Sequence, residues 1–93
     1  LMLTEAERQQ LEAMDTSIRS LERQLVQLRK AKAPQATIDA LKAQIKAARS
    51  ARDAFAKSIR TAALNQFSAR LDLLVADANM KLAFLQSLLA RLP

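Results

Sequence analysis

The residues that could do chemistry in this chain are carboxylates, amines, guanidinium groups and hydroxyls, because the sequence has no cysteine and no histidine. Thiol catalysis, imidazole acid–base catalysis and Cys/His metal sites are therefore excluded. The nine Asp and Glu residues do not cluster along the sequence, so we expect no metal site and no cofactor. Arg52 and Lys81 lie among apolar residues but have no acid–base partner set, so we expect the protein not to be an enzyme.

The lysines and arginines are concentrated in the middle of the chain. Residues 19–60 hold eleven of them against three acids, residues 1–18 hold one against four, and the net charge of the chain is +6. A basic surface attracts nucleic acid, lipid head groups or acidic proteins, although a solvated charged face is the commoner explanation. No aromatic side chains are interleaved with these charges, which weighs against nucleic acid. The candidate anion-binding residues are Arg29, Lys30, Lys32, Lys42, Lys46 and Arg49.

The composition and the apolar spacing predict an all-α fold. Glycine, which tight β-hairpin turns favour, is absent, and the only prolines are Pro34 and Pro93. Thr4 and Glu7 have the spacing of a capping box, which predicts a helix start. Large apolar residues then recur at steps of three and four, the heptad pattern of a coiled coil. This first seam consists of Leu11, Met14, Ile18, Leu21, Leu25 and Leu28.

A second seam follows Pro34 and consists of Ile38, Leu41, Ile45, Ala48, Arg52, Phe55 and Ile59. Its members and those of the first seam are about equally far from the proline, so we expect an antiparallel hairpin with Pro34 in the first turn of the second helix. Arg52 is the one charged residue in this seam. A buried arginine needs a partner, so we expect it to pair with Asp15 or Glu22 and to fix the register of the hairpin.

A third seam leaves two architectures open; it consists of Leu64, Phe67, Leu71, Leu74, Ala78, Leu82, Leu85, Leu89 and Leu92. In the favoured interpretation the chain turns near residues 62–65. The chain then has three helices, at about 4–32, 35–62 and 65–92. The first two form an antiparallel coiled-coil hairpin, and the third packs on it to give a three-helix bundle. The whole chain, residues 1–93, is then a single domain. In the alternative, the phase shift after Ile59 is a coiled-coil stutter. One helix then runs over 35–92 in an intertwined oligomer, because its C-terminal half has no cover from its own chain.

A second apolar stripe on the C-terminal segment predicts an interaction surface. Leu73, Met80, Phe84 and Leu88 lie roughly 120–150° around the helix from the third seam, with Leu88 at the margin. A helix in a small bundle needs only one apolar face, although a broad buried face would also explain the pattern. We therefore expect a non-enzymatic helical protein–protein interaction module: an oligomerisation domain, an adaptor or a small assembly or chaperone-type factor. The alternative is an anion-binding protein acting through the basic hairpin end.

Membrane insertion and export are not expected. The uncharged apolar stretch 82–90 is shorter than the ~20 residues that a membrane span needs. The first residues have neither a basic region nor a long apolar run, so we expect no signal peptide and a cytoplasmic location. The expected partner is a protein or a second copy of the chain, and an acidic surface is the alternative.

Overall fold

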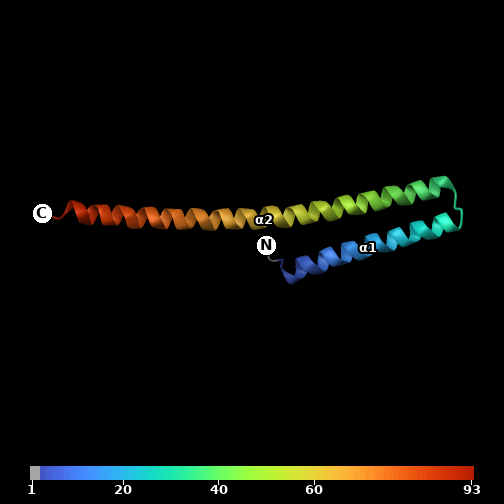
Figure 1. Ribbon diagram of the computed structural model, residues 1–93, viewed down its shortest axis with the longest axis horizontal. Helices are drawn as coiled ribbons and strands as arrows, with labels where there is room; N and C mark the ends of the chain where they lie inside the picture. The colour runs from blue at the N-terminus through green and yellow to red at the C-terminus, as the bar shows by residue number, and fades with distance from the viewer. Residues whose placement is uncertain (1–2) are drawn as a thin grey trace. The chain divides into compact units, whose positions relative to one another are not determined.

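The computed structural model describes residues 3–93 and contains two helices, α1 (Glu5–Lys30) and α2 (Gln35–Ala90) (Figure 1). The expected all-α class is confirmed, but the three-helix bundle is wrong, since the described residues form no third helix. The turn expected at 62–65 does not occur because these positions hold no glycine or proline, and Ala62, Ala63 and Leu64 are strong helix formers. A helix running on from Gln35 was the alternative interpretation; its intertwined oligomer stays a prediction.

The chain divides into two units, which are described separately. The hairpin unit comprises residues 1–60, and the C-terminal unit comprises residues 61–93. Helix α2 contributes to both units, because it begins in the first and ends in the second.

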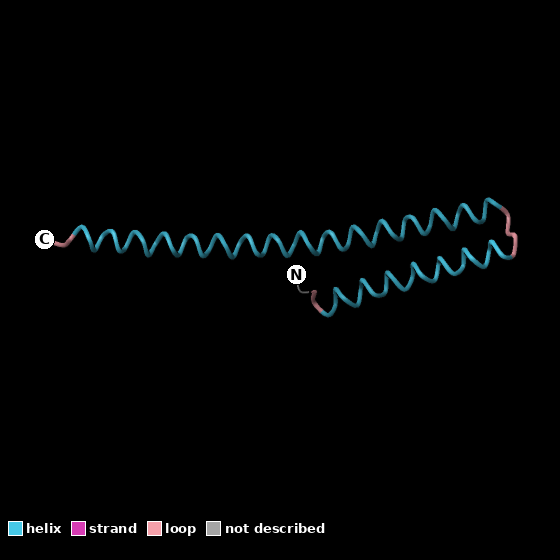
Figure 2. Tube along the Cα trace, viewed as in Figure 1, coloured by secondary structure: helices cyan, strands magenta, loops and turns pink. Residues whose placement is uncertain are grey.

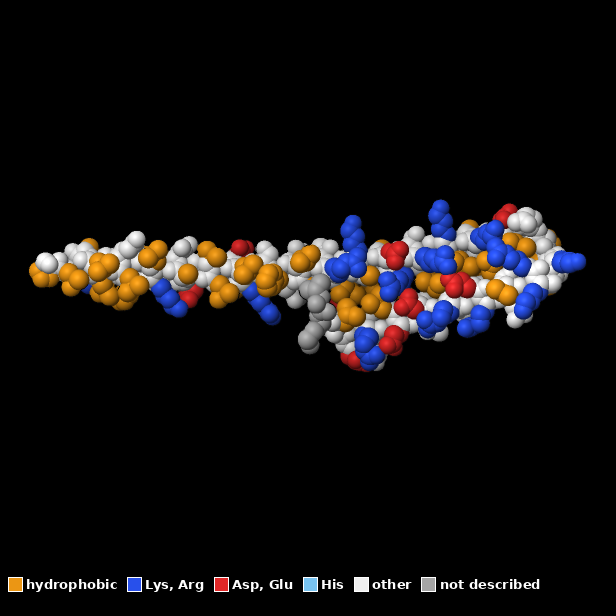
Figure 3. Space-filling model, viewed as in Figure 1, with side chains coloured by type: hydrophobic (Ala, Val, Ile, Leu, Met, Phe, Trp, Pro, Cys, Tyr) orange, Lys and Arg blue, Asp and Glu red, His pale blue; other side chains and the backbone are white. Residues whose placement is uncertain are grey.

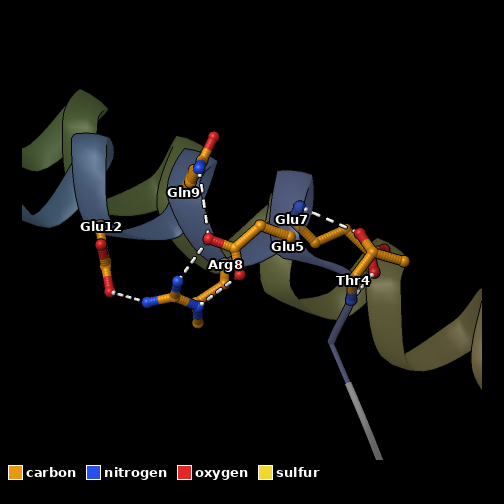
Figure 4. Close-up of polar contacts among 6 residues, drawn as sticks. All are labelled: Thr4, Glu5, Glu7, Arg8, Gln9 and Glu12. Carbon is orange, nitrogen blue, oxygen red and sulfur yellow. Dashed lines mark hydrogen bonds and ion pairs between the residues drawn. The ribbon is translucent and has the colours of Figure 1, made fainter.

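The start of α1 is fixed by the capping box that the sequence predicts (Figure 4). The Glu7 amide donates to the Thr4 hydroxyl at 3.1 Å, and the Thr4 amide donates to the Glu7 carboxylate at 2.9 Å. These bonds satisfy two donors that have no partner inside the helix. Arg8 lies between Glu5 and Glu12, and its hydrogen bond to Glu5 and the charge of Glu12 raise its pKa. All of these groups are exposed, so this network stabilises the helix end only slightly.

The turn between the helices is built without glycine. Lys32 has a φ of 53°, in the left-handed region, and its amide donates to the Arg29 carbonyl at 3.1 Å. The Ala33 amide donates to the Leu28 carbonyl at 3.0 Å, so the two bonds form a Schellman motif with Lys32 at the position usually taken by glycine. Pro34 lies just before α2 rather than in its first turn, and its carbonyl accepts the first helical hydrogen bonds.

The hairpin unit has a narrow apolar core between α1 and the first part of α2, which lie side by side (Figure 2). Its buried residues are Ile18, Ile38, Leu41, Ile45 and Ile59. The other large seam residues are half-buried, Leu28 among them, and Leu25 and Ile45 line the same surface groove. This is the antiparallel pairing that the two heptad seams predict. A two-helix core leaves most of its seam residues partly accessible, because no third element of the described chain covers its open edges.

The C-terminal unit is a helix with no cover in the described chain. Ala63 is half-buried, and every residue from Leu64 to Pro93 is exposed. The unit also lacks the dense charge of the hairpin unit, with three basic and two acidic residues in 61–93. In Figure 3 hydrophobic side chains accordingly dominate the C-terminal unit, whereas most lysine and arginine side chains gather over the hairpin unit.

Candidate interaction surface

The main stripe of the C-terminal unit consists of the nine third-seam residues, Leu64, Phe67, Leu71, Leu74, Ala78, Leu82, Leu85, Leu89 and Leu92. The exposed fractions of its large members run from 45% at Leu71 to 67% at Leu92. The bundle interpretation required these residues to be covered by the hairpin, and that expectation is wrong. Soluble monomers rarely expose a contiguous apolar surface of this kind, so the stripe is a candidate interaction site.

The second stripe, formed by Leu73, Met80, Phe84 and Leu88, is also accessible. Met80 and Leu73 are 73% and 72% exposed, Phe84 is 64% exposed, and Leu88 is 42% exposed. The structure therefore leaves two apolar faces of one helix uncovered. In the three-helix bundle that the sequence favoured, only the second stripe would be uncovered.

The two edges of the main stripe differ in charge. At 100° per residue, Arg70, Asp77 and Lys81 follow one edge, which we call the charged edge. Lys81 Nζ lies 2.8 Å from Asp77 Oδ2, one helical turn away. The opposite edge carries uncharged residues: Ser68, Val75, Asn79 and Gln86. Flanking charges of this kind select partner and orientation in coiled coils.

Helix α2 also contains an 18-residue stretch that is long and apolar enough to cross a membrane, with mean hydropathy 1.3 and none of it buried. Within the C-terminal unit, residues 73–90 contain only Asp77 and Lys81 as charged side chains. This segment includes the shorter uncharged stretch 82–90. A charged side chain at the centre of a bilayer costs about 2.5–3.5 kcal/mol on insertion scales, and two lie in this segment. The signal is therefore weak.

The candidate anion-binding residues, Arg29, Lys30, Lys32, Lys42, Lys46 and Arg49, are all exposed. Lys42, Lys46 and Arg49 line a shallow groove of about 340 Å³, but Glu22 and Asp53 line it as well. Arg49 forms an ion pair with Glu22 across the hairpin. The acids in the groove offset part of its positive charge, which reduces its attraction for anions.

Arg52 forms the cross-helix ion pair that its seam position suggests. Its Nε lies 3.0 Å from Asp15 Oδ1, and the two side chains are 36% and 39% exposed. Glu22, the other expected partner, pairs with Arg49 instead. Because both groups of the Arg52–Asp15 pair keep contact with water, the pair contributes about 1 kcal/mol or less to stability. Its role in fixing the register stays a prediction.

No group of three or more carboxylates within residues 3–93 is arranged to hold a metal ion. Arg52 lies in the hairpin unit and Lys81 in the C-terminal unit, and each has its own acidic neighbour.

No protein-family model, curated protein or solved structure matches this chain.

Proposed function

We propose that this protein is a non-enzymatic helical association module, with the hairpin unit as its folded base and the C-terminal unit as its contact surface. The observation that carries this proposal is that every member of the main stripe is exposed, with its large side chains 45–67% accessible. A helix normally directs such a stripe to a core. The first seam already packs with the second, so the third seam has no partner within residues 3–93.

The heptad spacing of the main stripe favours another helix as the partner. Leucines at steps of three and four fit as knobs into holes of a facing helix. Full burial of one such side chain contributes about 1.5–3 kcal/mol, and eight large side chains of the stripe are at least 45% exposed. Their combined burial can offset the roughly 4–15 kcal/mol of freedom lost on association. The second stripe offers a separate apolar area on another face of the same helix.

Charge placed on the stripe tests the proposal. Leu71→Asp with Leu85→Asp puts two carboxylates into the main stripe, and we expect this variant to sediment as a monomer. Ala83→Asp with Ala90→Asp adds the same charge away from both stripes, and we expect it to assemble like the unaltered protein. Circular dichroism checks that both variants keep their helix content.

Two results would contradict the association module. One is an unaltered chain that is monomeric at about 100 μM, well above the Kd of a weak complex, and that retains no protein from a lysate. The other is equal loss of assembly in both double variants, since the effect would then follow net charge rather than the stripe.

A further inference from the structure

The main stripe has a symmetry that identifies one particular partner. Its steps are three and four throughout, except at Ala78, where two steps of four follow one another. Such a stutter locally unwinds a coiled coil, so a facing helix must carry a matching stutter at the same level to stay in phase. A second copy of this chain meets that requirement when its own Ala78 lies opposite.

On both sides of Ala78 the stripe reads the same in either direction. Its large members occur in pairs equally distant from Ala78: Leu64 with Leu92, Phe67 with Leu89, Leu71 with Leu85, and Leu74 with Leu82. Two antiparallel copies related by a twofold axis at Ala78 would therefore stack every apolar residue against an apolar residue. Alanine at the axis, the smallest side chain of the stripe, lets the helices approach closely.

The charged edge separates the antiparallel arrangement from the parallel one. In the antiparallel register Asp77 of each copy faces Lys81 of the other, which gives two symmetric ion pairs beside the axis. Arg70 faces Leu88, whose methyl groups suit the aliphatic stem of arginine. On the other edge Ser68 faces Gln86. A parallel pair would place Arg70 beside Val75 and Lys81 beside Gln86, with no opposite charges in contact.

The chain exposes more surface than a compact monomer of its size. Its accessible surface is 7688 Å², whereas a folded monomer of its 10.3 kDa mass exposes about 5,400 Å². This excess belongs to both units together, and within it the eight large side chains of the main stripe are each at least 45% exposed, so they are available for burial. The stripe begins at Leu64, shortly after Ile59, the last residue buried in the hairpin unit, so pairing over 64–92 uses no hairpin residue.

From this register we propose that the occupant of the main stripe is a second copy of this chain, bound antiparallel across a twofold axis at Ala78. The inference rests on the proposed function, because it names the partner of the same surface. Of the second stripe, Leu88 lies at the edge of such a pair, whereas Leu73, Met80 and Phe84 remain on its outside.

Cysteine cross-linking tests the arrangement cleanly, because the chain has no cysteine of its own. Three single variants of the full chain are needed: Leu64→Cys, Ala78→Cys and Leu92→Cys. Under mild oxidation we expect Ala78→Cys to form a disulfide-linked dimer, because the two sulfurs meet at the axis. Leu64→Cys and Leu92→Cys should not cross-link alone, since each lies about 42 Å along the helix from its counterpart. Their mixture should cross-link.

The outcomes separate the two proposals. Cross-linking in the mixture and at the axis, but not in either end variant alone, supports the antiparallel pair. Cross-linking of each end variant with itself overturns the antiparallel arrangement and leaves the association module intact. If none of the variants cross-links and the unaltered chain stays monomeric, the second copy is excluded as the partner. Monomeric chain bound to phosphatidylcholine vesicles would show that lipid covers the stripe, and would also overturn the inference.

Discussion

Reversing single charges beside the proposed axis should separate contacts between copies from contacts within one helix. Asp77→Lys leaves each chain with two lysines at 77 and 81, and Lys81→Asp leaves each with two aspartates. In the antiparallel pair either variant then places like charges opposite each other at both symmetric positions. Mixing the two variants restores opposite charges at both positions. We therefore expect each variant alone to dissociate more readily, and the mixture to form a heterodimer.

The size of this effect follows from the exposure of the two groups. The Lys81 and Asp77 side chains are 74% and 58% exposed, so each ion pair contributes about 0.2–1 kcal/mol. Two attractions become two repulsions of similar size, which totals about 0.8–4 kcal/mol. That corresponds to a roughly 4- to 700-fold rise in the dissociation constant at 1.4 kcal/mol per tenfold. The repulsion within each helix is present in monomer and dimer alike, so it cancels in the association constant.

Sedimentation equilibrium at low salt would measure the dissociation constants. Asp72→Lys is the matched control, because it makes the same charge change away from the stripe and its charged edge. The difference between Asp77→Lys and this control should shrink as salt is raised, because exposed charges are screened. Unchanged dimerisation of both single variants, with no preference for the heterodimer in the mixture, would refute the facing of Asp77 and Lys81.

Three further predictions concern the hairpin unit, and thermal or denaturant unfolding measures each. Lys32→Gly should stabilise the hairpin by about 0.5–1 kcal/mol, because glycine adopts the left-handed conformation without the side-chain cost; a loss of stability would mean that the lysine side chain itself contributes. Leu41→Ala should destabilise it by about 2–4 kcal/mol, since Leu41 is only 7% exposed; a loss below 1 kcal/mol would contradict a packed core. Arg52→Met should cost less than about 1 kcal/mol, because the pair with Asp15 is half-exposed; a loss of several kcal/mol would reveal a buried charge left unpaired.

The hairpin was predictable from sequence because two independent signals agree on it. The heptad seams are centred on the proline turn, and the capping box marks the start of α1. The left-handed residue at the turn carried no signal, since Lys32 occupies a position at which glycine is usual.

The turn near Ala63 was wrongly predicted because a phase shift between two seams has two physical causes. A shift accompanies a chain reversal, but it also occurs as a stutter within one continuous helix. The residue types should have decided between them: the segment 61–65 contains neither glycine nor proline and includes two alanines and a leucine. Helix propensity along this segment therefore outweighs the apolar pattern, which alone is satisfied by either arrangement.

For the candidate surface, the sequence indicated the second stripe as a contact surface, but it did not indicate that the main stripe is exposed. Leu73, Met80, Phe84 and Leu88 were singled out because a bundle helix needs only one apolar face. The exposure of Leu71 and its neighbours follows from the continuous helix, so it was hidden by the wrong turn. Arg52 was expected to pair with Asp15 or Glu22. Both acids lie about one helical turn from Ile18, the residue opposite Arg52, so the spacing alone does not choose between them. The structure shows the pair with Asp15.

The mass of the unaltered full chain in solution tests self-association most directly. Sedimentation equilibrium over a range of protein concentrations should give twice the 10.3 kDa mass of one chain, with a monomer appearing only on dilution. A mass of one chain at every concentration, with the helix content intact, would contradict pairing through the C-terminal unit.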